Sequence, residues 1–310
     1  MKVLVTCPPM LRLIDEFKPI FNAKGIEIFC PDVVQTLSVE ELKSLVPQYD
    51  GWIIGDDPAN KEVFAAGKAG KLKAAVKWGV GVDNVDFVAA KELDIPVTNT
   101  PRMFGGEVAD IAMGYVIALA RQTFLIDRGV RDGKWLKPSG ISLADKTVAL
   151  VGFGDIGRNT AKRLLAVDMR VIAYDPYFQP VEGLEVVQSA KWPDRLEEAD
   201  FIVLTCALTP ENKHMINAET LAKTKPGVRI VNVARGSLIN ENALIAALGS
   251  GQVHSAALDV FEVEPLPMNS PLREFEQCIF GSHNGSNTVD AVRRASEKAI
   301  SLLLDFLGVE

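Results

Sequence analysis

One histidine of the chain lies in a loop that leaves room for a ligand. His283 is the central residue of the segment FGSHNGS, which follows an apolar run and has a glycine on each side of the histidine. Histidine titrates near neutral pH, so in such a loop it is suited to exchanging protons. His214 reads as the polar start of a helix and His254 precedes a buried strand, and neither position favours catalysis. We therefore predict His283 as a general acid and base.

An arginine and a glutamate follow two other apolar strands. Arg235 stands directly after the run VNVA, and its planar guanidinium suits a carboxylate, although such an arginine can also cap a strand end or pair on the surface. Glu264 follows a second strand, and a carboxylate beside His283 would raise the pKa of the histidine by favouring its charged form. Glu262 is the rival candidate for that role. Ligands of open α/β sheets bind at the carboxyl ends of strands, where all these side chains are expected.

Together these types of side chain suit the reduction of a small 2-keto acid. Such a reaction needs a cation for the carboxylate, a group of near-neutral pKa that protonates the carbonyl oxygen as hydride arrives, and a carboxylate that tunes this donor. A methyltransferase that binds its cofactor at a glycine-rich loop is disfavoured, since it would not require Arg235, Glu264 and His283 at three separate strand ends.

A glycine-rich turn between a strand and a helix predicts a dinucleotide site. The sequence VALVGFGDIGR, residues 148–158, is an apolar strand that runs directly into G-x-G-x-x-G. Gly152 permits the tight turn, Gly154 lets pyrophosphate approach the backbone, and Gly157 allows the helix to pack closely on the strand. The phosphate would then face free N–H groups at the helix start. The motif also occurs in turns that bind no nucleotide, but here its context is complete.

An acidic residue after the following strand selects the type of dinucleotide. Asp175 lies 18 residues after Gly157. Its carboxylate can accept both hydroxyls of the adenosine ribose and would repel a 2′-phosphate, and the loop 175–180 has no arginine to receive that phosphate. NAD is therefore favoured over NADP as the cofactor.

Apolar, β-branched runs alternate with helical patterns along the whole chain. Such alternation is typical of an α/β fold with parallel sheets and helices on both faces. Since an α/β unit precedes the glycine loop, we predict two doubly wound parallel-sheet domains. A Rossmann NAD-binding domain, 101–284, is inserted into a flavodoxin-like substrate domain, 1–100 and 285–310. Strands are expected at residues 3–6, 51–54, 74–77, 147–151, 171–174, 201–205, 229–233, 255–258 and 278–280.

Three further segments have distinct patterns. One long helix is expected over 105–127, which has no proline and carries apolar residues at spacings of three or four, and it could bridge the two domains. The polar segment 128–145 reads as a linker or as an arm that packs on a second subunit. The last helix is expected over 288–307.

Composition and charge narrow the range of partners. The formal net charge of -7 comes without a basic run, so a nucleic-acid partner is not expected, whereas a small anionic acid can bind in a locally positive pocket. The four cysteines show no metal-ligand spacing, so we expect no metal site and reduced thiols in a cytoplasmic protein. The first residues read as a strand rather than a signal peptide, and the apolar segments are too short to span a membrane.

The motifs in their order resemble the D-isomer-specific 2-hydroxyacid dehydrogenase family, which includes phosphoglycerate, glycerate/hydroxypyruvate and D-lactate dehydrogenases. The resemblance covers most of the chain and rests on KWGVGVDNVD (77–86), NTP (99–101), the glycine loop, VNVARG (231–236), ALDVF (257–261) with Glu264-Pro265, and SHNG (282–285). It implies that Arg235 binds the carboxylate and carbonyl oxygen of the substrate, that His283 is the acid/base, and that Glu264 orients and charges the histidine.

The resemblance also implies further contacts and an assembly. The backbone amides of Val80 and Gly81 would hold the substrate carboxylate from the other domain, with closure of the cleft between the domains. Cofactor contacts are implied for Asp155, Ile156, Ala234 and Asp259. A homodimer is implied, formed mainly through the cofactor domains.

The substrate side chain stays open at this point. Phosphoglycerate dehydrogenases tend to carry an arginine near the position of Gly55, where this chain reads GDD. This difference argues against a phosphorylated substrate. Lys77 and Arg102 are candidates to bind substrate instead, although a surface charge is the simpler interpretation of each. We expect NAD-dependent hydride transfer at C2 of a small 2-hydroxy or 2-keto acid. The alternatives are 3-phosphoglycerate dehydrogenase-type activity and a non-catalytic NAD-sensing binding protein.

Overall fold

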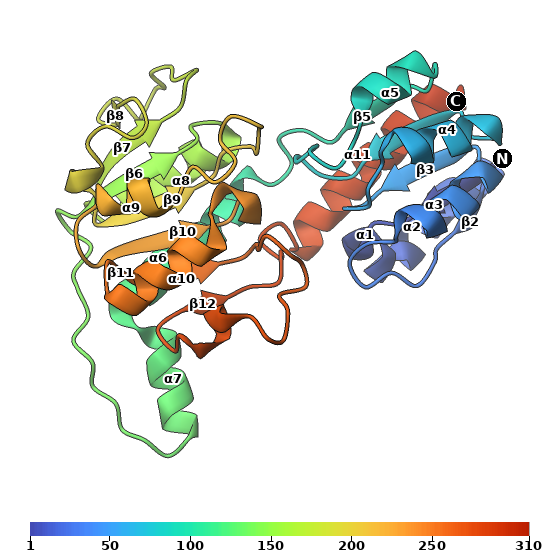
Figure 1. Cartoon of the computed structure of the whole chain (residues 1–310). Helices are drawn as coiled ribbons and strands as arrows, with labels where there is room; N and C mark the ends of the chain where they lie inside the picture. Colours follow the sequence, from blue (N-terminus) through green and yellow to red (C-terminus); the bar gives the residue numbers. More distant parts are fainter. Residues whose placement is uncertain (310) are drawn as a thin grey trace. The chain divides into compact units, whose positions relative to one another are not determined.

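Two compact units make up the chain in the computed structural model, which describes residues 1–309. The split unit contains residues 1–104 and the C-terminal stretch from Asn287 on, and the inserted unit is Gly105–Ser286. The sequence prediction put these boundaries at 100/101 and 284/285. Each unit is built on one parallel sheet with helices packed on it, so the predicted α/β fold class is confirmed (Figure 1).

The split unit has a five-stranded sheet in the order β2-β1-β3-β4-β5, with all neighbours parallel. Its central strands are buried because α3, α4 and α5 cover one face and α11 lies against the other, where a Cβ on Gly51 would be 3.2 Å from Leu303. The strands are Lys2–Val5, Glu27–Phe29, Gly51–Ile54, Ala74–Lys77 and Val97–Asn99. The helices α1 to α5 are Pro8–Arg12, Ile14–Ala23, Val39–Leu45, Lys61–Ala69 and Phe87–Glu92, and α11 is Val289–Leu307.

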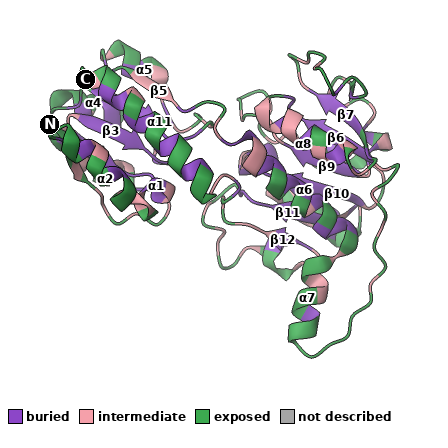
Figure 2. Ribbon diagram, turned by 180° about the vertical axis from the view of Figure 1, so that it is seen from behind, coloured by how far each residue is buried: buried purple, intermediate pink, exposed green. Residues whose placement is uncertain are grey.

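The inserted unit has a seven-stranded sheet in the order β12-β11-β10-β9-β6-β7-β8, also parallel throughout. Its chain direction across the sheet reverses between β6 and β9, which is the place where such sheets bind ligands. Figure 2 shows the central strands of both sheets as buried. The strands β6 to β12 are Thr147–Val151, Arg170–Tyr174, Gln188–Ser189, Phe201–Leu204, Val228–Asn232, Val253–Leu258 and Ile279–Phe280. The helices α6 to α10 are Gly105–Arg121, Thr123–Arg131, Asp155–Leu165, Ala218–Ala222 and Glu241–Ser250.

Three strands were missed by the sequence prediction, and all three lie at sheet edges. They are β2, β5 and β8, of three, three and two residues. A segment so short shows no alternation of apolar and polar residues, and an edge strand is covered on fewer sides. Tertiary pairing with β1, β4 and β7 therefore decides these three strands.

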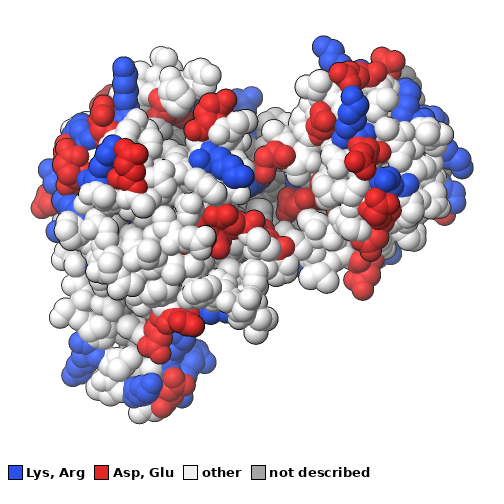
Figure 3. Space-filling model, viewed as in Figure 1, with Lys and Arg blue, Asp and Glu red and all other residues white. Residues whose placement is uncertain are grey.

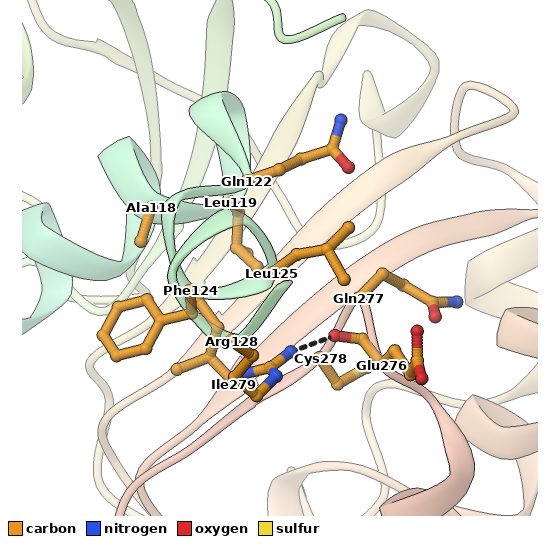
Figure 4. Close-up of a pocket in the computed structure, with 10 residues that line it drawn as sticks. All are labelled: Ala118, Leu119, Gln122, Phe124, Leu125, Arg128, Glu276, Gln277, Cys278 and Ile279. Atoms are coloured by element: carbon orange, nitrogen blue, oxygen red, sulfur yellow. Dashed lines mark hydrogen bonds between the residues drawn. The ribbon is translucent and has the colours of Figure 1, made fainter. Parts of the chain in front are cut away.

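The long helix expected over 105–127 is wrong in one respect, because the chain bends within it. Gln122 adopts a left-handed backbone conformation (φ 53°), and α6 and α7 meet there at 68°. The Arg128 side chain donates to the carbonyl oxygen of Glu276 and holds the bend over a small pocket (Figure 4). The expected polar arm therefore begins after Arg131. Within residues 1–309 no single helix has the length and apolarity to cross a membrane, and only α6 and α7 taken together would pass on both counts.

Candidate active site

The glycine loop between β6 and α8 has the geometry of a phosphate cradle. A Cβ on Gly157 would lie 2.1 Å from the carbonyl oxygen of Gly152, and one on Gly152 (φ 95°) would lie 2.7 Å from the backbone of Cys206. Neither position can therefore carry a side chain. Gly154 differs, since nothing lies within 4 Å of its Cβ position, so the open space needed by a pyrophosphate is present there.

Asp155 begins the helix that points at this space. Its carboxylate lies against Gly105 of α6, where a Cβ would be 2.4 Å from Oδ2, and it also accepts from Asn159. The negative side chain is thus directed toward α6, and the first backbone N–H groups of α8, those of Asp155 and Ile156, are the donors that a helix leaves unused. These features fit a dinucleotide phosphate.

Asp175 lies at the end of β7 and is bonded to the glycine loop. Its Oδ2 accepts from the backbone N–H of Phe153 at 2.7 Å, and its Oδ1 accepts from that of Tyr177 at 2.8 Å. The carboxylate is therefore held in place by two backbone donors at the end of the neighbouring strand. A ribose that reaches Asp175 would lie next to a phosphate at Gly154 along the same strand ends.

His283 and Glu264 are brought together by the fold although 19 residues separate them. The imidazole Nδ1 lies 2.8 Å from Glu264 Oε2, and Glu264 Oε1 accepts from the backbone N–H of Phe261 at 2.9 Å. Both side chains are about three-quarters buried, at 25% and 22% exposure. The carboxylate thus fixes the orientation of the ring.

Glu262, the rival of Glu264, pairs with a different histidine. Its Oε1 lies 3.2 Å from His214 Nε2 and accepts from the backbone N–H of Glu241, whose own carboxylate accepts from the N–H of Glu262. Burial, with the charge of Glu262 adding to it, raises the pKa of Glu241. His214 lies in a turn with φ 54°, not at a helix start, because Asn217 caps α9.

The third histidine, His254, has different surroundings from His283. His254 lies inside β11 rather than before it, and its Nδ1 is 2.9 Å from the hydroxyl of Ser255. Burial and the charge of Arg229 lower its pKa. Glu264 and His283 are therefore the histidine–carboxylate pair that follows two neighbouring strands, β11 and β12.

Arg235 follows β10, the strand beside β11. Its Nη1 donates to the carbonyl oxygen of Ala234, and its backbone is tied to the side chain of Asn232 by a bond of 2.9 Å. A Cβ on the next residue, Gly236, would lie 1.8 Å from the carbonyl carbon of Phe261. The loop that carries Arg235 therefore packs directly on the turn that carries Glu264.

Asp259 shapes the histidine loop, which sequence reasoning did not anticipate. The side chain is buried, and it accepts from the backbone N–H groups of Asn284 and Gly285 while its own carbonyl accepts from His283 N. Burial, and then the charge and hydrogen bond of Asp259, raise the pKa of Tyr115 on α6. In the sequence Tyr115 is one position of the long helix expected over 105–127, and no sequence signal indicates this contact. The cofactor contacts of Asp259 and Ala234 stay predictions.

Four predicted substrate residues lie in the split unit, three of them at or just after the end of β4 and the fourth, Arg102, after β5. The loop of Val80 and Gly81 is held by Asn99, whose side-chain amide donates to the carbonyl oxygens of residues 79 and 80. Arg102 is exposed, as a surface charge would be. Lys77 is not: its side chain is 3% exposed and pairs with Asp56 at 2.9 Å, so the surface interpretation is wrong for this residue.

Among residues 1–309 no group of three or more His, Cys, Asp or Glu side chains could hold a metal ion. The four cysteines of the chain form no disulfide.

Comparison with known proteins gives one consistent result. The family described as D-isomer specific 2-hydroxyacid dehydrogenase, NAD binding domain, matches residues 113–285. A hydroxypyruvate reductase of Thermotoga maritima is 38% identical over 278 residues, which cover 88% of this chain and 90% of that protein. The TT0316 protein of Thermus thermophilus, known from a crystal structure, matches with a TM-score of 0.87 at 32% identity over 99% of this chain and 97% of its own.

A second kind of relative is longer than this chain. A D-3-phosphoglycerate dehydrogenase of Mycobacterium bovis is 39% identical over 274 residues, which cover 87% of this chain but 51% of that protein. The chain thus spans about half the length of the phosphoglycerate dehydrogenase it matches.

Proposed function

The chain belongs to the D-isomer-specific 2-hydroxyacid dehydrogenases, and we propose that Arg235, Glu264 and His283 carry its reaction, with NADH preferred over NADPH. As a member of this family it is an oxidoreductase that moves a hydride between a nicotinamide dinucleotide and C2 of a small 2-hydroxy or 2-keto acid. The observation that carries the residue assignment is the distance of 2.8 Å between His283 Nδ1 and Glu264 Oε2. Both residues follow strands of the sheet that also contains β6, and the glycine loop follows β6.

In the proposed mechanism three side chains of the inserted unit divide the work of reduction. The guanidinium of Arg235 binds the carboxylate and carbonyl oxygen of the keto acid and draws electron density toward that oxygen. Because Nδ1 of His283 faces Glu264, Nε2 delivers the proton to the carbonyl oxygen. The carboxylate of Glu264 keeps the ring oriented and favours its protonated form before the transfer. The bound dinucleotide would supply the hydride.

The cofactor is proposed to be held by the glycine loop, by Asp175 and by backbone groups at the start of α8. Gly154 leaves room for pyrophosphate, and the N–H groups of Asp155 and Ile156 would receive it. Asp175 accepts the ribose hydroxyls and repels a 2′-phosphate, which is the physical reason for a preference for NADH. Ala234 and Asp259 are proposed to complete the site near the nicotinamide.

The substrate carboxylate is proposed to bind the backbone amides of Val80 and Gly81. This assignment is supported by the Asn99 bonds, which fix the loop with its carbonyls engaged. Phosphoglycerate dehydrogenase-type activity is the second candidate, favoured by relatives of that name. Against it, residues 55–57 read GDD and put two carboxylates after β3.

We propose that the protein forms a homodimer through α7 and the arm that follows it. Apolar side chains are exposed there on both elements, including Phe124, Val130 and Trp135, the last at 79% exposure. Patches of this kind on a folded domain commonly mark an interface. Figure 3 shows that charges of both signs surround this region, which suits a contact between two identical surfaces.

The test is the rate of NADH oxidation by the purified protein on a panel of 2-keto acids. The panel contains glyoxylate, pyruvate, hydroxypyruvate, 3-phosphohydroxypyruvate, 2-oxoglutarate and bulky acids, with NADPH as the control cofactor. Turnover with NADH and much less with NADPH supports the proposal. Tight NADH binding without turnover on any acid would contradict it and favour the NAD-sensing alternative.

A further inference from the structure

The carboxyl ends of three neighbouring strands in the split unit meet at one point of its sheet. The order β2-β1-β3-β4-β5 means that the chain leaves β1 toward one edge and returns on its other side as β3. Sheets of this order bind ligands at that reversal, outside the carboxyl ends of the strands. Thr6, Asp56 and Lys77 lie at or just after the ends of β1, β3 and β4.

Lys77 is unusual at this point because its ammonium group is almost fully buried. The side chain is 3% exposed, and within residues 1–309 its hydrogen-bond partner is Asp56, whose Oδ1 lies 2.9 Å from Nζ. An ammonium has three N–H donors, so two of them are not used by this part of the chain. A buried cation with unused donors is costly unless something else accepts from it.

The same ammonium lies beside the loop proposed to hold the substrate carboxylate. Its Nζ is 3.6 Å from the Cβ position of Gly79, the residue before Val80. Asp56 is itself placed by Gln35, whose amide donates to Oδ2 at 3.3 Å, and its side chain is 39% exposed. The ion pair therefore presents both N–H donors and carboxylate oxygens at this point of the sheet.

We propose that Asp56 and Lys77 select the substrate by the group on C3, favouring an uncharged hydrogen-bonding group such as a hydroxyl over a phosphate or a second carboxylate. The inference rests on the proposed function, since it takes the keto acid to be bound at Val80 and Gly81. A hydroxyl can accept from the unused N–H groups of Lys77. A phosphate or carboxylate group on C3 would meet the carboxylate of Asp56 at close range, which opposes its binding.

The experiment compares kcat/KM for hydroxypyruvate and 3-phosphohydroxypyruvate in the wild type and in Asp56→Asn. The amide keeps the acceptor for Lys77 and removes the negative charge. We expect the ratio to shift toward the phosphorylated acid by about ten-fold, or ~1.4 kcal/mol. The matched control is Glu92→Gln, which removes the same charge from the exposed pair with Lys61 in the same unit and should leave the ratio unchanged.

A second variant tests the lysine. Lys77→Gln should raise KM for hydroxypyruvate about ten-fold relative to that for pyruvate, whose methyl group accepts no hydrogen bond. A ratio unmoved by Asp56→Asn overturns the inference even if Lys77→Gln fails to fold, and so does an equal loss on both acids in a folded Lys77→Gln. No turnover by the wild type overturns the proposed function and this inference together, whereas turnover with an unmoved ratio overturns this inference alone.

Discussion

At the scale of single residues, the ring of His283 and the loop that carries it are each held by a different acidic residue. Glu264 bonds the ring at Nδ1, while Asp259 bonds the backbone of the loop and lies beside the hydroxyl of Tyr115. A histidine in a mobile loop would transfer a proton more slowly, because proton transfer requires a fixed geometry. The buried Asp259 therefore fixes the backbone of the loop that carries His283.

Replacement of His283 by alanine should lower kcat at least about 100-fold, since a general acid contributes roughly 10² to 10⁴. The affinity for NADH, measured by quenching of protein fluorescence, should stay within about two-fold, because no cofactor contact is assigned to this side chain. His254→Ala is the matched control, since His254 lies within β11 and has no role in the proposed mechanism. Wild-type turnover by His283→Ala would remove this residue from the mechanism.

At the scale of elements, the β6–α8 turn depends on glycines for two separate reasons. At Gly157 the backbone of Gly152 fills the place of a side chain, so the restriction comes from the packing of helix on strand. At Gly154 that place is open, so the restriction would come only from a ligand. A substitution at Gly157 therefore tests the stability of the fold, and a substitution at Gly154 tests cofactor binding.

Gly154→Ala should melt within about 2 °C of the wild type, because its new methyl group meets no protein atom within 4 Å. Its affinity for NADH should fall at least about ten-fold, since the methyl group enters the space proposed for pyrophosphate. Gly157→Ala should instead lower the melting temperature strongly, because the methyl group and the Gly152 carbonyl oxygen overlap. Calorimetry and NADH titration measure the two effects. Unchanged NADH affinity in a folded Gly154→Ala would exclude a phosphate at this position.

At the scale of the whole molecule, the inserted unit exposes apolar side chains on α7 and the arm that α7 begins. The bend at Gln122 directs α7 away from the line of α6, and Arg128 fixes that bend through Glu276 (Figure 4). A bend secured in this way keeps Phe124 and Val130 exposed rather than packed on the sheet. Exposure of these side chains to water is costly in a monomer, and their burial between two subunits would be favourable.

The double variant Phe124→Ser, Trp135→Ser should therefore shift the protein from dimer to monomer in light scattering coupled to gel filtration. The loss of two large apolar side chains from an interface weakens association by several orders of magnitude when they are central to it. Val186→Ser, which changes an exposed apolar residue elsewhere in the inserted unit, is the control and should leave the mass unchanged. A dimeric double variant, or a monomeric wild type, would contradict the proposed interface.

Features that depend on local spacing could be predicted from the sequence alone. The buried central strands, the glycine loop before α8 and the helix that begins after Thr288 were all predictable, because backbone periodicity and turn chemistry are set within about ten residues. The positions of Arg235, Glu264 and His283 after strands followed from the same patterns. Their contacts with substrate and cofactor stay predictions.

Which side chains contact each other depends on the packing of the whole fold. Glu262 and Glu264 are equivalent by position in the sequence, and the packing of distant loops gives the first to His214 and the second to His283. Lys77 reads as an ordinary strand-end charge until its neighbours bury it against Asp56. The physical reason is the same in each case: a contact between residues far apart in the chain depends on how strands and loops pack, and local sequence carries no record of that packing.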